Sequence, residues 1–263
     1  MAKYQEDAPI LENRRLQNDY YQVDVAAESI SRDTEPGQFV HVRLPYFEHR
    51  VLRRPFSIYN VQPEKGILSI IYKVVGEGTQ HLSMLQSGDE LNLMGPLGTG
   101  FSIPRSGFLP IIVAGGYGCA ATYLLAKRSP VPCLCLLGGR SRQDLLLVNE
   151  FTNTGAAVRT STDDGSEGHH GVVTDLLDVA LAEADTTPLV YACGPAPMLR
   201  AVSRSVLARG LDAEVSLDHV MCCGVGACFA CVVKMKADTP EGWEYVRTCK
   251  RGPVLKASQI YWE

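Results

Sequence analysis

The sequence has no long hydrophobic run and no excess of positive charge. None of its apolar stretches approaches the ~18 residues that a membrane-spanning helix needs. Its net charge of −4 argues against a nucleic-acid-binding surface, which normally requires a basic patch. The first ten residues carry charges where a signal peptide would have its apolar core. Internal repeats, low-complexity tracts and long linkers are also missing. These absences favour an ordinary soluble protein.

Length and cysteine content narrow the class further. The chain has 263 residues, and because a domain typically has ~100–150 residues, two or three domains are expected. Hydrophobic residues make up 46% and charged residues 21%, as in typical globular proteins. Nine cysteines without a secretion signal indicate the cytoplasm. There thiols stay reduced, so clustered cysteines indicate metal binding or catalysis.

The cysteines gather in the stretch MCCGVGACFAC, residues 221–231, followed by a lone Cys249. From Cys223 the spacing is C-x4-C-x2-C, and seventeen residues separate the last of these from Cys249. This is the plant-type spacing for a two-iron, two-sulfur cluster. Gly224 and Gly226 tolerate positive φ, so the loop can aim backbone N–H groups at the sulfides. The predicted ligands are Cys223, Cys228, Cys231 and Cys249.

Two other uses of these cysteines remain open from the sequence. Structural zinc usually takes two C-x2-4-C pairs, whereas here three cysteines share one loop and the fourth stands alone. Disulfides would require an oxidising compartment, for which the sequence has no signal. Cys222 is an alternative first ligand, but its C-x5-C spacing fits the pattern less well, so Cys222 is interpreted as a bystander.

Residues 1–105 are predicted to form an antiparallel β-barrel. Short alternating or apolar segments recur with turn residues between them, a pattern typical of barrels. A short helix is expected at 77–86. The expected strands are 20–25, 37–44, 56–61, 67–75 and 89–94.

This barrel contains a candidate site for a pyrophosphate-bearing, ring-containing cofactor. Arg54 offers a planar fork for a phosphate, Pro55 favours an extended backbone, and Ser57 offers a hydroxyl. Taken alone, an arginine beside a strand is more often a surface residue. The segment from Gly76 to Thr79 strengthens the interpretation, because a strand followed by a glycine turn and a helix presents N–H groups to an anion.

Residues 106–212 are predicted to form an α/β nucleotide-binding domain with a parallel sheet. A buried strand, 108–114, leads into a glycine turn containing Gly115, Gly116 and Gly118, and then into a helix over 119–128. This arrangement lets backbone N–H groups approach a pyrophosphate. Thr174 is a candidate N-cap. Further strands are expected at 132–137, 156–161 and 189–193, and further helices near 143–151, 174–182 and 197–208.

Charged residues at two strand ends bear on the nucleotide. The carboxylates of Asp163 and Asp164 would repel a 2′-phosphate and accept hydrogen bonds from free ribose hydroxyls, which favours NAD over NADP. Arg140 and Arg142 argue the other way, because arginines can hold that phosphate. The adjacent pair His169 and His170 lies in a glycine-flanked loop and is interpreted as solvated rather than metal-bound.

Several motifs together resemble the ferredoxin–NAD(P)H reductase family: R-P-F-S at 54–57, Y-K-V-V-G-E-G-T at 72–79, G-P-L-G at 95–98 and C-G-P-x-x-M at 193–198. The resemblance implies that FAD binds in the barrel. It also implies that Cys193 lies near the carbon of nicotinamide that donates hydride, and that Gly194 and Pro195 let the dinucleotide pass. The FAD-binding residues that it implies are Arg54, Pro55, Phe56, Ser57, Ile71, Tyr72, Lys73, Gly78 and Thr79.

Residues 213–263 are predicted to form a small ferredoxin-like [2Fe–2S] module. A hairpin, 232–236 and 243–246, is expected to return Cys249 to the other ligands, and Gly252 and Pro253 to end it. The apolar end of this segment, 260–262, is expected to pack on the module or on another protein.

The whole order of parts resembles the electron-transfer subunits of class 1B dihydroorotate dehydrogenases, down to T-D-D-G-S-x-G at 162–168. That resemblance implies exchange of electrons between NAD and an FMN-containing catalytic subunit, by way of FAD and the cluster, in pyrimidine biosynthesis. The expected assembly is a heterotetramer with two copies of each subunit. The alternatives are a subunit serving a hydrogenase or a bifurcating ferredoxin–NADP reductase, and a redox-sensing binding module.

Overall fold

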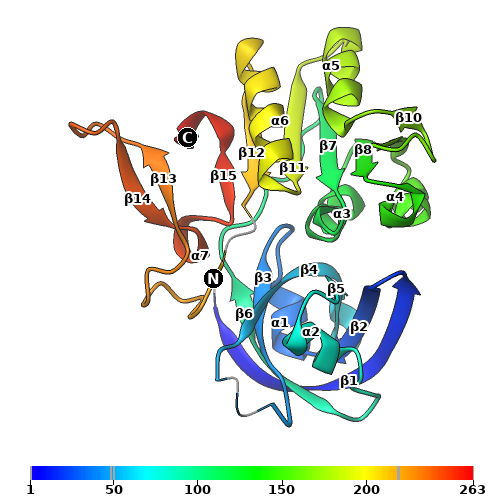
Figure 1. Cartoon of the computed structure of the whole chain (residues 1–263), viewed down its shortest axis with the longest axis vertical. Coiled ribbons are helices and arrows are strands. Elements are labelled where there is room, and N and C mark those ends of the chain that lie inside the picture. Colours follow the sequence, from blue (N-terminus) through cyan, green and yellow to red (C-terminus); the bar gives the residue numbers. More distant parts are fainter. Residues whose placement is uncertain (1, 48, 50, 218–219, 263) are drawn as a thin grey trace.

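The computed structural model describes residues 2–47, 49, 51–217 and 220–262. They form a closed six-stranded barrel, a seven-stranded sheet and a two-stranded hairpin. The barrel lies at one end of the molecule, the seven-stranded sheet at the other, and the hairpin projects beside them (Figure 1).

The barrel is antiparallel throughout, with strand order β1-β2-β5-β4-β3-β6. Each pair of neighbouring strands runs in opposite directions, and β1 closes the ring by pairing with both β2 and β6. Two short helices and a 3-10 turn, η1 (Pro63–Lys65), complete it. The elements are β1 (Tyr4–Gln17), β2 (Tyr20–Ala26), α1 (Glu28–Asp33), β3 (Phe39–Arg43), β4 (Arg54–Gln62), β5 (Ile67–Lys73), α2 (Glu77–Leu82) and β6 (Glu90–Leu97).

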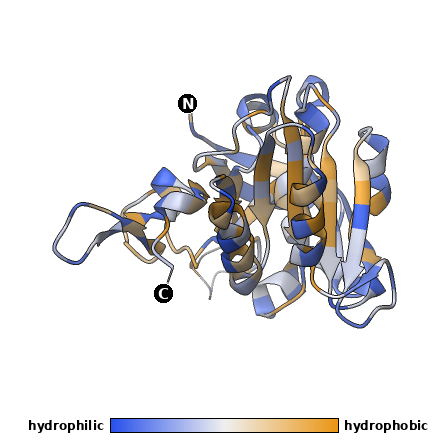
Figure 2. Cartoon of the chain, turned by 90° about the horizontal axis from the view of Figure 1, so that it is seen from above, coloured by the Kyte–Doolittle hydropathy of each residue, from blue (hydrophilic) through white to orange (hydrophobic). Residues whose placement is uncertain are grey.

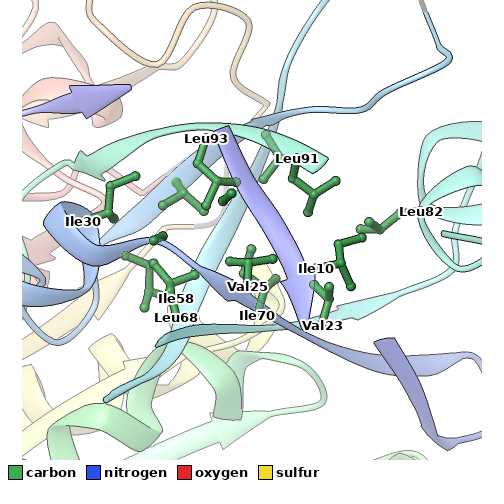
Figure 3. Packing of buried hydrophobic residues seen from close by; sticks show 14 of the residues in the cluster. Ile10, Val23, Val25, Ile30, Ile58, Leu68, Ile70, Leu82, Leu91 and Leu93 are labelled. Atoms are coloured by element: carbon green, nitrogen blue, oxygen red, sulfur yellow. The ribbon is translucent and has the colours of Figure 1, made fainter. Parts of the chain in front are cut away.

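Alternation along each strand divides its side chains between the barrel interior and the outside. In β3, Val40 and Val42 enter the barrel core, whereas Phe39 packs in a separate cluster outside it. In β5, Ile70 faces the interior and Ile71 packs against the central sheet. The interior is filled by aliphatic side chains from all six strands and from α1 and α2, including those labelled in Figure 3. The outer face of β3 is therefore available to pack against another part of the chain.

The central sheet has the order β10-β9-β8-β7-β11-β12-β15, and all its pairs are parallel except β12 with β15. The strands are β7 (Leu109–Gly115), β8 (Leu134–Gly139), β9 (Ala157–Thr162), β10 (His169–His170), β11 (Pro188–Cys193), β12 (Ala213–Ser216) and β15 (Val254–Lys256). The helices are α3 (Gly118–Arg128), α4 (Val148–Asn153), α5 (Val173–Glu183) and α6 (Ala196–Ala208), with η2 (Arg142–Asp144).

Helices cover both faces of this sheet, which explains why its strands are apolar on both sides. Ile111 and Val113 of β7 pack with α5 and α6, whereas Ile112 and Ala114 pack with α3 and α4. Figure 2 shows the hydrophobic strands between helices whose outer sides are hydrophilic.

The barrel and the sheet share one apolar interface. Helix α3 packs on β4, where the rings of Tyr123 and Tyr59 lie 4.7 Å apart. Polar contacts flank it: the Arg128 guanidinium donates to the Thr34 carbonyl at 2.7 Å, and the Gln17 amide donates to the Leu145 carbonyl at 2.9 Å. The two parts are thus packed directly together.

The cysteine-rich segment is joined to both parts. Its hairpin, β13 (Val232–Lys236) with β14 (Trp243–Arg247), is followed by α7 (Thr248–Arg251), β15 and η3 (Ala257–Gln259). Strand β15 pairs with β12 in the central sheet. Ile260 is buried and bridges to Met235, so the expected packing of the apolar end is confirmed.

The predicted fold class is confirmed: an N-terminal antiparallel barrel, a parallel α/β sheet and a cysteine-rich C-terminal segment. The boundaries at 105 and 212 stay a prediction, and β12 and β15, which lie beyond the second boundary, belong to the central sheet. Strand β1, helix α1 and the pairing of β15 were not foreseen.

Two local predictions are wrong. The helix expected near 143–151 is divided into η2 and α4, because Leu147 has a left-handed φ of 63° and Leu145 and Leu146 run buried between them. Thr174 is not an N-cap, since α5 begins at Val173. Here Asp175 caps instead: its carboxylate accepts a hydrogen bond from the Val172 N–H at 3.2 Å.

Among the described residues, no helix combines the length and the apolar character that crossing a bilayer would demand.

The barrel core makes a first prediction. Leu93 of β6 has no exposed surface, so Leu93→Ala should lower the free energy of unfolding by about 2–5 kcal/mol through lost burial and a cavity. Leu11 of β1 is 43% exposed, and Leu11→Ala should change it by about 0.5 kcal/mol or less. Urea unfolding followed by circular dichroism compares them. Equal effects of the two substitutions would contradict the packing described here.

Candidate functional site

The four predicted ligand cysteines come together at the loop between β12 and β13. The thiol of Cys223 interacts with that of Cys228, and the thiol of Cys249 with that of Cys231. The charge of Cys223 also acts on Cys249. Helix α7 carries Cys249 back to the loop after the hairpin. The sulfurs are therefore arranged as two pairs next to each other.

Backbone donors in the loop point at one of these sulfurs. The Ala227 N–H donates to the Cys223 sulfur at 3.2 Å. Burial raises the pKa of Cys223, but hydrogen bonds from the N–H groups of Cys228, Val225 and Ala227 outweigh it, so the pKa falls to about 6. Burial, together with the neighbouring Cys231 and Cys223, raises the pKa of Cys249 to about 12. Without a metal, Cys249 is therefore held as the neutral thiol.

The donor set matches the way in which a [2Fe–2S] cluster is held. Such a cluster takes two protein ligands on each iron, so that four sulfurs divide into two pairs. The pairs Cys223–Cys228 and Cys231–Cys249 have this form. The pairing therefore agrees with the predicted cluster, and all nine cysteines are free rather than disulfide-bonded.

The loop glycines have the predicted conformation. Gly224 has a φ of 66° and Gly226 a φ of 87°. Each also makes room for a neighbour: a Cβ on Gly226 would lie 2.6 Å from the side chain of Lys250, and one on Gly224 would lie 2.9 Å from Nε2 of His41. His41 is a functional candidate that sequence reasoning missed.

Phe229 is unusual within the loop. It is 61% exposed although aromatic, and its φ of 59° is in the left-handed region that non-glycine residues rarely adopt. The guanidinium of Arg247 lies 4.6 Å from the centre of its ring and donates to the Gly226 carbonyl at 2.6 Å. An exposed aromatic side chain is thus held in place beside the exposed Cys228.

The predicted flavin residues lie on β4, β5 and the start of α2. The Arg54 guanidinium packs 5.0 Å from the Phe47 ring and lies against Gly78, where a Cβ would be 2.5 Å from its Nε. Pro55, Phe56 and Ser57 follow along β4 and are partly buried. Gly78 therefore provides the space that the arginine occupies.

The other predicted flavin residues contribute unequally. The side chains of Ile71 and Tyr72 are buried in the two apolar clusters, so they are not free to contact a ligand. The Thr79 hydroxyl accepts from the Val75 N–H at 2.9 Å and so closes the start of α2. Lys73 reaches out of β5, with its Nζ 3.4 Å from the Tyr20 hydroxyl.

A cleft of about 550 Å³ lies between the barrel and the carboxyl ends of the central strands. Gly115, Gly116, Asp163 and Pro195 line it, as predicted for a dinucleotide site. Lining residues that the sequence did not identify include Tyr20, Asp144, Ser161, Gly138 and Gly139. Ser161 is buried, and its hydroxyl has no hydrogen-bond partner among the described residues, so it is available to a ligand hydroxyl or phosphate.

Three predicted residues lie behind the cleft rather than on its wall. Cys193 is only 4% exposed at the end of β11. A Cβ on Gly118 would lie 2.3 Å from the Cys193 carbonyl oxygen, and one on Gly194 would lie 2.6 Å from the Met198 side chain. These two glycines permit close packing of α3 and α6 on β11. Because Cys193 is almost fully buried, its thiol is not placed to exchange a proton with solvent.

The charged residues near the ribose position divide in two. Asp163 and Arg140 line the cleft. Asp164 turns away: the Ser166 hydroxyl and N–H both donate to its carboxylate, and these bonds lower its pKa. Arg142 pairs with Glu167 at 3.6 Å. His169 and His170 are exposed, with His169 3.2 Å from the Asp175 carboxylate.

A flavin-type barrel, a dinucleotide cleft and a four-cysteine loop together define a reductase that carries an iron–sulfur module. Comparisons with known families agree. Residues 9–101 match the family described as oxidoreductase FAD-binding domain, and residues 218–261 match the iron-sulfur cluster binding domain of dihydroorotate dehydrogenase B.

Curated relatives match almost the whole chain. The electron transfer subunit of dihydroorotate dehydrogenase B (NAD(+)) from Desulforamulus reducens is 37% identical over 98% of both chains, and that from Enterococcus faecalis is 37% identical over 99% of both. A solved structure of an NADH-dependent reduced ferredoxin-NADP oxidoreductase, described for flavin-based electron bifurcation, superposes with a TM-score of 0.84 at 30% identity, covering 97% of this chain and 90% of that one. The chain belongs to the family of electron transfer subunits of dihydroorotate dehydrogenase B.

The cysteine arrangement makes a second prediction. Cys228→Ser should abolish stable cluster binding, because one of four sulfur ligands is lost, whereas Cys222→Ser should retain it. Iron and acid-labile sulfide analysis, with visible absorption, measures both. Loss of the cluster in the Cys222 variant, or its retention in the Cys228 variant, would contradict the predicted ligand set.

The cleft makes a third prediction. Asp163→Ser should lower the preference for NADH over NADPH, as the ratio of kcat/KM values for flavin reduction, by about tenfold, the equivalent of ~1.4 kcal/mol. Asp164→Asn removes a charge next to it but keeps an oxygen for Ser166, and it should change the ratio much less. If the native chain uses NADPH as well as NADH, the argument from Asp163 is wrong.

Proposed function

We propose that this chain carries electrons between NAD and the FMN of a separate catalytic subunit, and so supports oxidation of dihydroorotate to orotate in pyrimidine biosynthesis. The observation that carries the proposal is the convergence of four thiols on the outside of a flavin-type barrel. Identity of 37% over 98% of a named electron transfer subunit supports the choice of pathway.

The chemistry requires a converter, because nicotinamide exchanges two electrons together as hydride whereas an iron–sulfur cluster exchanges one at a time. Bound FAD supplies that conversion, and the cluster supplies the one-electron connection. The chain's contribution is to hold and orient these groups. Arg54 to Ser57, Lys73 and Gly78 would hold FAD, and Cys223, Cys228, Cys231 and Cys249 would hold the cluster.

The cleft residues would orient the dinucleotide. Gly115 and Gly116 let its pyrophosphate approach the backbone at the start of α3, Ser161 offers its unpaired hydroxyl, and Asp163 accepts from the ribose. Pro195 would form the wall of the cleft at the nicotinamide end. Cys193 supports this end from beneath as a positioning residue, since its buried thiol is in no place to exchange protons with water.

A partner surface is proposed at the cysteine loop. Val225, Cys228 and Phe229 are exposed there, and backbone strain at an exposed aromatic residue often marks a functional contact. We assign this surface to the FMN-containing catalytic subunit, in a heterotetramer of two copies of each. The chain has no (β/α)8 repeat of its own in its sequence. A cytoplasmic location agrees with nine free cysteines.

A second function has one specific observation in its favour. The bifurcating oxidoreductase structure superposes with a TM-score of 0.84, so a subunit of such an enzyme is the alternative.

The test is reconstitution. The isolated chain, loaded with FAD and cluster, should reduce dyes with NADH and should not oxidise dihydroorotate. Addition of the catalytic subunit encoded in the same organism should give NAD-dependent formation of orotate. NADH oxidation that requires both ferredoxin and NADP, without orotate formation, would instead favour the alternative.

The partner surface makes a fourth prediction. Phe229→Ser should weaken binding to the catalytic subunit at least tenfold, as expected for loss of an aromatic anchor, while reduction of bound flavin by NADH stays within about twofold. Tyr245, on β14, is also 61% exposed and serves as the matched control. Equal loss of affinity in Phe229→Ser and Tyr245→Ser, measured by calorimetry, would contradict docking at the loop.

A further inference from the structure

His41 lies on β3, between the two predicted cofactor sites. On one side, β3 pairs with β4, and His41 is opposite Pro55 of the predicted flavin segment. Alternation places its side chain on the same outer face as Phe39, whose ring centre lies 5.8 Å from that of His41. That face carries the apolar cluster formed by Phe39, Leu97, Met221, Cys231 and Cys249. The imidazole therefore lies where the barrel meets the cysteine loop.

The imidazole is completely buried but has no hydrogen-bond partner. Its exposed fraction is 0%, and neither Nδ1 nor Nε2 has a partner among the described residues. Proteins pair nearly all of their buried polar groups, because an unpaired one gives up its hydrogen bonds with water. An imidazole in either protonation state has at least one N–H to donate. Such a donor indicates an acceptor outside the polypeptide.

The direction of the ring identifies that acceptor. A Cβ built on Gly224 would lie 2.8 Å from Cδ2 and 2.9 Å from Nε2 of His41, so the ring packs directly on the loop backbone. Gly224 immediately follows the predicted ligand Cys223. The remaining neighbours in the cluster, Phe39, Leu97 and Met221, offer no strong acceptor. The acceptors that the site brings to this position are the sulfurs of the metal cluster.

We propose that His41 donates a hydrogen bond from Nε2–H to a sulfur of the [2Fe–2S] cluster and thereby raises its reduction potential. The inference rests on the proposed function, because it assumes that the four cysteines hold this cluster. Nδ1 is then the unprotonated nitrogen, so the buried donor is satisfied and only a lone pair is left unpaired.

The effect on the potential follows from charge. The reduced cluster has one more negative charge than the oxidised cluster, so a donor aimed at a sulfur stabilises the reduced form more. Hydrogen bonds to cluster sulfurs are among the factors that set the potential. His41 would thus make the cluster a better electron acceptor.

The experiment is a redox titration of the full chain carrying FAD and cluster, followed by electron paramagnetic resonance. His41→Phe keeps an aromatic ring and removes the donor. It should lower the equilibrium constant for adding one electron about tenfold, which corresponds to about 59 mV. His41→Gln places an amide N–H in the same region. It should restore the equilibrium constant for adding one electron to within about threefold of the native value.

The matched control is Phe39→Leu, which alters packing on the same face but removes no donor, and which should change the constant less than twofold. If the equilibrium constant for adding one electron to His41→Phe is within twofold of the native value, the proposal is overturned. Equal shifts in His41→Phe, His41→Gln and Phe39→Leu also overturn it, because packing alone would then explain them.

A spectroscopic measurement keeps the inference testable if His41→Phe fails to fold. In native protein with ¹⁵N only in histidine, electron spin echo spectra of the reduced cluster should show a nitrogen coupling and an exchangeable proton. The ¹⁵N coupling should be lost in His41→Gln, whereas the exchangeable proton should remain, because the amide N–H takes the place of the imidazole N–H. Absence of nitrogen coupling in the native protein overturns the inference. Absence of iron and sulfide in the native protein instead contradicts the proposed function, so the two failures are distinct.

Discussion

The contact between the outer face of β3 and the cysteine loop holds the predicted redox groups in one frame. Phe39 and Leu97 of the barrel pack against Met221, Cys231 and Cys249, and the buried His41 lies against Gly224. One-electron exchange depends on a constant separation, and an apolar contact of this kind allows no sliding, because protein interiors pack as densely as crystals. The position of the cysteine loop depends on this contact, since the loop alone has almost no hydrophobic core.

The central sheet fixes the same segment from the other side. Strand β15 pairs with β12, and Ile260 packs with Met235 in the cluster that also contains Val202 and Val206 of α6. Glu214 of β12 adds a polar link, because its carboxylate accepts from the Ser102 N–H at 2.8 Å and pairs with Lys256 at 3.0 Å. The cysteine-rich segment is therefore attached to the barrel and to the sheet, which explains how a short, cysteine-rich stretch keeps a defined position.

Much of this was predictable where sequence and local physics agree. The β7–glycine–α3 unit follows from a buried apolar run and a phosphate-type turn, and the cysteine spacing depends only on local reach. Strand β1 was missed because most of its residues are polar and because it includes Pro9. The helix expected near 143–151 was wrong because tertiary packing buries Leu145 and Leu146. Ser161 and His41 were missed for a different reason. Nothing in the sequence near either residue indicates that its polar atoms are buried without partners, since that depends on strands distant in the chain.

The two pairs of cysteines in the loop differ in their burial and in the hydrogen-bond donors around them. Cys231 and Cys249 are 2% and 1% exposed, and burial raises the pKa of Cys249. Cys223 receives backbone donors that lower its pKa to about 6, and its partner Cys228 is exposed. A backbone N–H group thus points at the Cys223–Cys228 pair, whereas the Cys231–Cys249 pair is packed against the barrel. Because His41 reaches the loop at Gly224, its N–H adds to the same side. The N–H donors of the loop therefore lie on the side that carries Phe229, the surface on which the catalytic partner is proposed to bind.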